Sequence, residues 1–158
     1  MFAAYNGYQK GKVSISDQAL REEVRRRTEE IRGQIDVLFS QAHKNKHRDL
    51  RDSLQDIIDI CDQFISDVRF GLSHTSASTH DAAVKMNKKS LKLLIEHDFN
   101  TLDRLVKCEV EINAMLIQSG NSAVEAELCS LSTATKLNLA ESKHHFTQRN
   151  MIMGSHLG

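Results

Sequence analysis

The 158-residue sequence contains no proline and no tryptophan, and only 5% of its residues are aromatic. Proline interrupts helix interiors and marks many loops, so its absence is typical of a fold with few, short loops. With so few aromatic side chains, a core must be built mainly from Leu, Ile, Val and Ala. Such a core favours packed helices over a β-sandwich.

The formal net charge is zero, because 21 Lys and Arg residues balance 21 Asp and Glu residues. A protein that binds nucleic acid usually has an excess of basic residues, so this balance argues against a nucleic-acid partner. The charges are nevertheless uneven: residues 1–48 contain ten basic and six acidic side chains, and residues 49–70 contain two and six. This distribution favours association with copies of the same chain or with other proteins.

The sequence lacks the motifs that carry common chemistries. Its three cysteines are widely spaced and form no CxxC pair, which predicts buried, reduced thiols (Cys61, Cys108 and Cys129). It has no Gly-rich phosphate loop and no nucleophile elbow. We therefore expect a protein that is not an enzyme, with no catalytic residues and no cofactor.

Two histidines have the spacing of metal ligands on one helical face. His43 and His47 are four residues apart, but no carboxylate accompanies them, and two histidines do not complete a zinc site. His144 and His145 are adjacent and point to different faces of a helix. The sequence thus predicts a polar turn at residues 43–47 and no metal site.

No membrane-spanning or secretory segment is expected. No window approaches the ~18 consecutive apolar residues of a transmembrane helix, and residues 1–12 have neither an apolar region nor a cleavage pattern. We therefore expect a cytoplasmic protein, with the nucleus as the alternative compartment.

Apolar residues recur at heptad spacing in long stretches, which predicts an all-α fold. The expected architecture is an antiparallel four-helix bundle, or a set of long coiled-coil hairpins, within a single domain over residues 14–150. Residues 1–13 are expected to form a flexible aromatic arm, and residues 151–158 a disordered tail. The predicted helices cover about residues 16–43, 48–71, 81–118 and 122–150. The clearest seam consists of Val24, Thr28, Ile31, Ile35, Leu38 and Ala42.

The apolar register shifts by one residue at residues 43–47. The next seam begins at Leu50 and continues through Leu54, Ile57, Cys61, Phe64 and Val68. Either a tight turn around Asn45 or a continuous helix with changed winding fits this shift. A single helix would extend ~80 Å at 1.5 Å per residue, so the turn is preferred. The second helix is predicted to end at Gly71, before a polar loop.

The two later helices contain polar residues on their apolar faces. Asp98 lies on the stripe of the third helix, where we expect it at the edge, reaching water; a buried acid with a partner is the alternative. The fourth seam weakens towards its end, so this half is expected to fray or to be completed by another molecule. Its predicted members are Val124, Leu128, Leu131, Thr135, Asn138, Ser142 and Phe146.

Three groups of residues are candidates for interaction. The first is the aromatic arm, with Phe2, Tyr5 and Tyr8, which packs either over the bundle or on a neighbouring subunit. The others are an acidic stripe (Asp52, Asp56, Asp59) and a basic stripe (Lys85, Lys88, Lys89, Lys92). The two stripes either face water or dock on each other, within one chain or between chains.

The sequence therefore predicts a non-enzymatic helical module for protein–protein interaction or assembly, a scaffold or adaptor that forms a homo-oligomer or binds a helical partner. The alternative is a peripheral membrane protein that binds or remodels an anionic surface through the lysine stripe and the arginines of the first helix.

Overall fold

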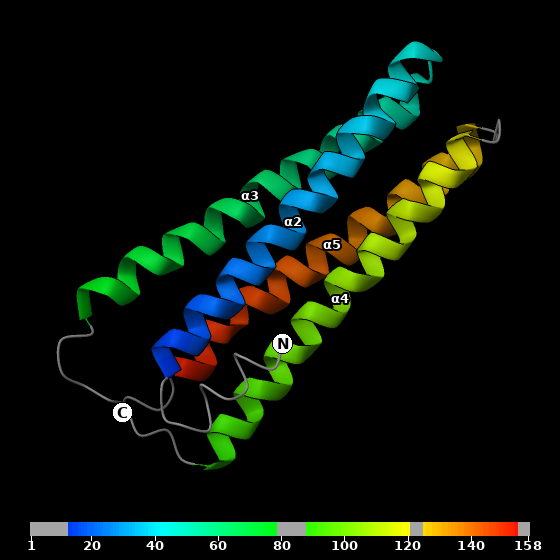
Figure 1. Cartoon of the computed structure of the whole chain (residues 1–158). Helices are drawn as coiled ribbons and strands as arrows, with labels where there is room; N and C mark the ends of the chain where they lie inside the picture. Colours follow the sequence, from blue (N-terminus) through cyan, green and yellow to red (C-terminus); the bar gives the residue numbers. More distant parts are fainter. Residues whose placement is uncertain (1–12, 79–87, 121–124, 155–158) are drawn as a thin grey trace.

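The computed structural model describes residues 13–78, 88–120 and 125–154, and these residues form four long helices and no strand. The helices are α2 (Val13–Lys44), α3 (Arg48–Ser78), α4 (Lys88–Gly120) and α5 (Glu125–Gly154). Their direction alternates along the chain, so α2 and α4 run one way and α3 and α5 the other (Figure 1). The predicted all-α four-helix fold is confirmed.

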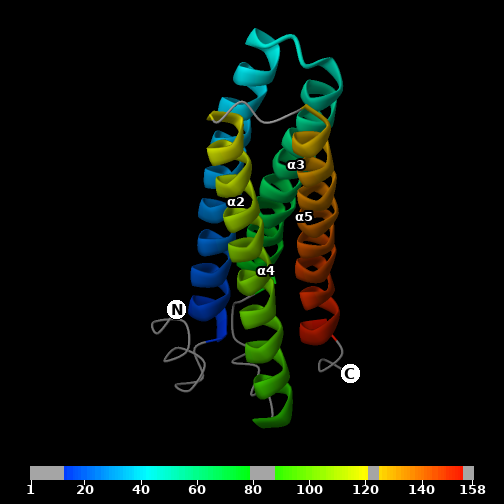
Figure 2. The same cartoon turned by 90° about the vertical axis from the view of Figure 1, so that its right-hand side faces the viewer.

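The four helices form two antiparallel hairpins that lie side by side (Figure 2). Helix α2 packs against α3 and α4, and α5 packs against the same two helices. Consequently α2 and α5 face each other across one diagonal, and α3 and α4 across the other. The neighbours α2 and α4 are parallel: Arg27 pairs with Glu109, and Ser119 donates a hydrogen bond to Gln41 further along both helices.

A tight turn joins α2 to α3, as the shift of apolar register predicted. Lys46 adopts a φ of 62°, in the left-handed region. The N–H of His47 donates to the carbonyl of Ala42 and the N–H of Lys46 donates to that of His43, at 2.9 and 3.2 Å. These two bonds are those of a Schellman motif, which ends a helix by satisfying its last carbonyl groups. The alternative of one continuous helix is therefore wrong.

The predicted seams of the first two helices form the core. All twelve side chains of these seams are buried, together with Leu20, Ile58 and Ile65. From α4 the core takes mainly Leu94, Leu105, Cys108, Ile112 and Met115. Burial of apolar side chains between helices is therefore the main source of stability.

Helix α3 is longer than predicted. It continues through Gly71 to Ser78, where a polar loop was expected. A single glycine inside a helix costs only about 1 kcal/mol, and this segment contains no proline to stop the helix. The prediction that the helix ends at Gly71 was wrong for this reason.

In two turns of α5, the buried residue is the one that follows the residue predicted for the seam. Ser132 and Leu139 are buried, whereas Leu131 and Asn138 are only half-buried. The hydroxyls of Thr135 and Ser142 donate to the carbonyls of Leu131 and Asn138 one turn earlier, so they are buried without losing hydrogen bonds. The buried seam is Leu128, Ser132, Thr135, Leu139, Ser142, Phe146 and Arg149.

The second half of α5 is completed by its own chain. Leu139, Phe146 and Arg149 are buried in the bundle, and the helix continues to Gly154. The expectation that this half frays or is completed by another molecule was wrong, because Arg149 finds acidic partners within the same bundle.

Some predicted features lie outside the described residues. These include the aromatic arm with Phe2, Tyr5 and Tyr8, as well as Lys85 and the start predicted for the third helix at residue 81. Within the described helices, no segment is long and apolar enough to cross a membrane.

Candidate functional site

A cluster of buried charges lies at the end of the bundle opposite the α2–α3 turn. It consists of Asp17 and Arg21 on α2, Asp98 on α4 and Arg149 on α5, and all four side chains are buried. The two carboxylates and two guanidinium groups balance each other in charge. We call these four residues the ionic cluster.

Arg149 links three helices within the ionic cluster. Its Nε and Nη2 donate to the two carboxylate oxygens of Asp98 at 2.7 and 3.2 Å, and its Nη1 donates to Asp17. Arg21 donates from Nε to the other oxygen of Asp17 at 3.0 Å, and its guanidinium lies 5.4 Å from the ring centre of Phe146. Such a fork-shaped arrangement suits the planar guanidinium group.

Asp98 corrects an expectation from the sequence. It was expected at the edge of its stripe, reaching water, but it is buried and accepts hydrogen bonds from Nε and Nη2 of Arg149. An unpaired buried carboxylate would be costly, and the bidentate ion pair removes that cost. The alternative of a buried acid with a partner is the one the structure bears out.

Two stacked histidines lie beside the ionic cluster. The rings of His97 on α4 and His145 on α5 are 4.0 Å apart and nearly parallel, at 9°. Thr101 donates its hydroxyl to the carbonyl of His97 at 3.1 Å, so its bond of 2.9 Å to Nδ1 of His145 requires that this nitrogen carry the proton. Among the residues that the structure describes, neither ring nitrogen of His97 has a hydrogen-bond partner. Burial, with the charges of His97 and Arg104, lowers the pKa of His145.

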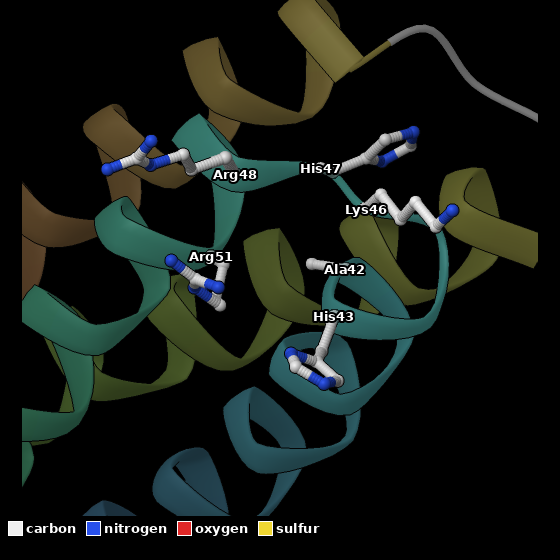
Figure 3. Close-up of a pocket in the computed structure, with 6 residues that line it drawn as sticks. All are labelled: Ala42, His43, Lys46, His47, Arg48 and Arg51. Carbon is white, nitrogen blue, oxygen red and sulfur yellow. The ribbon is translucent and has the colours of Figure 1, made fainter.

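A shallow hollow of about 350 Å³ lies at the α2–α3 turn, at the other end of the bundle (Figure 3). Its lining is strongly basic, but the side chains point in different directions rather than toward one point (Figure 3). His43 and His47 in particular point away from each other. The hollow is lined by Ala42, His43, Lys46, His47, Arg48 and Arg51. Among the described residues, no group of three or more His, Cys, Asp and Glu could hold a metal.

The arginines of α2 are engaged by acidic side chains. Arg26 pairs with Glu23 and Glu30, and Arg27 pairs with Glu23 and with Glu109 of α4. The hydrogen bond from Arg26, supported by Arg27, lowers the pKa of Glu23 to about 2. This face of α2 therefore has little charge left to attract an anionic membrane.

The acidic and basic stripes lie at opposite ends of the bundle. Asp52, Asp56 and Asp59 are exposed near the start of α3, where Asp56 pairs with Lys136 of α5 at 2.6 Å. Lys89 and Lys92 are exposed near the start of α4, and the side chain of Lys88 lies outside the described residues. The structure thus does not bring the two stripes together within one chain.

Helix α4 carries a second apolar face that points away from the core. Phe99, Val106, Val110 and Ile117 are exposed by 53, 39, 64 and 66%, respectively. Their spacing of seven, four and seven residues places them within an arc of about 40° along the helix. Cys108 lies midway between Phe99 and Ile117 in the sequence, but its side chain is buried on the opposite side of the helix. We call these four residues the outer stripe.

The outer stripe was not predicted, although its spacing is visible in the sequence. Only one apolar stripe was predicted on this helix, namely the one that contains Asp98. The other large apolar side chains that the described residues expose form no such line. They are distributed over all four helices: Val37, Phe70, Leu93, Leu137 and Met151.

The thiols have no reactive character. Burial raises the pKa of both Cys61 and Cys108 to about 12, so neither forms a thiolate near neutral pH. Cys129 is half-buried, and burial raises its pKa as well. All three are free thiols, as the sequence predicted, but the prediction that Cys129 is buried was wrong.

Comparisons with protein-family models, with curated proteins and with solved structures found no match to this chain.

Proposed function

We propose that this protein is a non-enzymatic helical module that acts by binding another protein surface, and that it self-associates. The outer stripe is the observation that supports this proposal. Four large apolar side chains in a line on one helix are unusual on a monomer surface, where exposed apolar residues are normally scattered. Covering them would contribute favourably to association.

The geometry of the stripe fits a helical partner better than a loop or a small molecule. The spacing of seven, four and seven residues is that of a coiled-coil seam, in which each side chain inserts between residues of a facing helix. The stripe extends about 27 Å at 1.5 Å per residue, the length of five turns of helix. A partner of the same kind would be a long helix lying along α4.

The oligomeric mass of the full chain, measured by sedimentation over a range of concentrations, tests this function. The double substitution Val110→Lys and Ile117→Lys should weaken self-association by roughly ten-thousandfold, because two identical copies together lose four buried apolar side chains that each contribute roughly 1.5 kcal/mol or more. Leu137→Lys on α5 is the matched control and should have no effect. A native chain that stays monomeric, or a double variant that associates equally well, would contradict the proposal.

Peripheral binding to an anionic membrane is the alternative function. The basic hollow at the α2–α3 turn supports it, with Lys46, Arg48 and Arg51 around one tip of the bundle. Flotation with vesicles containing anionic lipid tests it. Binding that is lost on changing these three residues to Glu, while the outer-stripe variant still binds, would favour the membrane over self-association.

A further inference from the structure

The outer stripe also indicates how two copies would be arranged. We propose that a second copy of this chain packs its own α4 antiparallel along the outer stripe, related by a two-fold axis level with Cys108. This inference rests on the proposed function, and it adds the partner, the helix and the direction of pairing.

The outer stripe of one copy is complementary to that of a second copy only when the two α4 helices run in opposite directions. In an antiparallel pair with the axis at Cys108, the two residues opposite each other have numbers that are equally far from 108. Phe99 then lies opposite Ile117 of the second copy, and Val106 opposite Val110. Every apolar residue of the stripe meets an apolar residue, as a closed two-fold interface requires.

The polar residues within the stripe support the same register. Asp103 and Asn113 continue the seam spacing of four and three residues between the apolar positions, and both would meet each other across the axis. The Oδ1 of Asn113 accepts a hydrogen bond from Gln34 at 3.5 Å, which leaves its Nδ2 to donate. Asp103 accepts from Lys107 at 2.8 Å through one carboxylate oxygen. Its other oxygen can accept from Nδ2 of Asn113 in the second copy. An amide opposite a carboxylate is a favourable pair.

A parallel pairing is disfavoured by the same residues. In register, Asp103 would face Asp103 of the second copy in the middle of the seam, and like charges directly opposite each other are destabilising. A parallel pair would also place Phe99 against Phe99 and Ile117 against Ile117. The amide of Asn113 would then face another amide and not a carboxylate. Charge thus selects the antiparallel arrangement.

The size of the interface limits its strength. One helix pair about 27 Å long lies at the small end of specific interfaces, which bury about 1,200 Å² or more. We therefore expect a reversible dimer whose population depends on protein concentration. The buried bundle beneath α4 does not need to change, because all four residues of the outer stripe are already exposed.

Disulfide trapping distinguishes the two directions. Phe99→Cys and Ile117→Cys are made separately in full-length chains that also carry Cys129→Ser, and each is oxidised alone and as an equal mixture. The antiparallel dimer predicts a disulfide-linked dimer only in the mixture, because residues 99 of the two copies are then about 27 Å apart. Leu137→Cys, exposed on α5, controls for random collisions.

The possible results separate this inference from the function on which it rests. A mixed disulfide between positions 99 and 117, at a level well above that of the Leu137→Cys control, supports the antiparallel dimer. Disulfides between two copies of the same single variant would overturn the antiparallel direction but would leave self-association through α4 standing. No disulfide, in a protein that sediments as a dimer, would overturn the use of α4 in this dimer. A protein that sediments as a monomer at every concentration would overturn both.

Discussion

The two ends of the bundle interior are held together by different forces. Near the α2–α3 turn, the interior contains apolar side chains such as Leu38, Leu54 and Met115. At the far end, the ionic cluster and the pair of stacked histidines lie among apolar side chains such as Leu20 and Phe146. Apolar packing is tolerant of small changes in alignment, whereas Arg149 must meet two particular carboxylates. The comparison suggests that one end supplies stability and the other specifies how the two hairpins align.

The largest expected effect comes from removing the centre of the ionic cluster. Arg149→Ala leaves two buried carboxylates without the guanidinium that joins them, which should cost about 3–5 kcal/mol of unfolding free energy. Leu139→Ala, on the same helix and also buried, is the matched apolar control, with an expected cost of about 2–5 kcal/mol. Denaturant unfolding at neutral pH measures both.

Acid should distinguish the two variants. In acid the negative charge that Arg149 balances is reduced, so the cost of Arg149→Ala relative to the native protein should shrink at low pH. The cost of Leu139→Ala involves no charge and should not shrink in the same way. If both costs respond equally to pH, the two ends of the interior do not differ in the manner described.

Replacing the whole ionic cluster should have a smaller effect, of the opposite sign. A variant with Asp17→Leu, Arg21→Met, Asp98→Leu and Arg149→Met removes the cost of burying four charges. Exchanges of this kind are often neutral or stabilising by about 1–4 kcal/mol. The expected result is an unfolding free energy at least equal to that of the native chain. A clear loss of stability would show that the ionic cluster contributes more than apolar packing at the same place.

The same variant tests the role of the cluster in alignment. If the ion pairs select one arrangement of the hairpins, the apolar variant should be stable but less uniquely folded. Broadened or doubled amide resonances of residues near positions 17, 98 and 149 would show this loss. A single sharp set of resonances would instead mean that apolar packing alone selects the alignment.

The sequence predicted the apolar end of the bundle better than the ionic end, for a physical reason. The seams of α2 and α3 follow a local heptad period, which is visible in any window of the chain. The ionic cluster depends on contacts between residues 132 and 51 positions apart, namely Asp17 with Arg149 and Asp98 with Arg149. No local pattern contains that information.

The seam of α5 was misplaced because its buried positions are small and polar. Leu131 is a stronger apolar signal than Ser132, yet Ser132 is the buried residue and shares a hydrogen bond with Ser53 of α3. Local hydrophobicity therefore pointed to a neighbouring line. The outer stripe could not be predicted for a different reason. Its apolar spacing is visible in the sequence, but only the burial of each side chain shows which of the two apolar lines on α4 faces solvent.

The smallest expected effect tests the stacked histidines at the ionic end. The pKa of His145 is lowered below its ordinary value of 6.5, mainly by burial and also by the charges of His97 and Arg104, although Asp98 acts in the opposite direction. The unfolded chain then binds a proton more readily than the folded one, so stability should fall as pH falls below about 6.5. His145→Gln should flatten this part of the stability curve, whereas His144→Gln should change it much less, because exposed His144 makes only the smallest contribution to the lowered pKa of His145. Equal curves for the native chain and His145→Gln would mean that this end of the bundle has no histidine-linked sensitivity to acid.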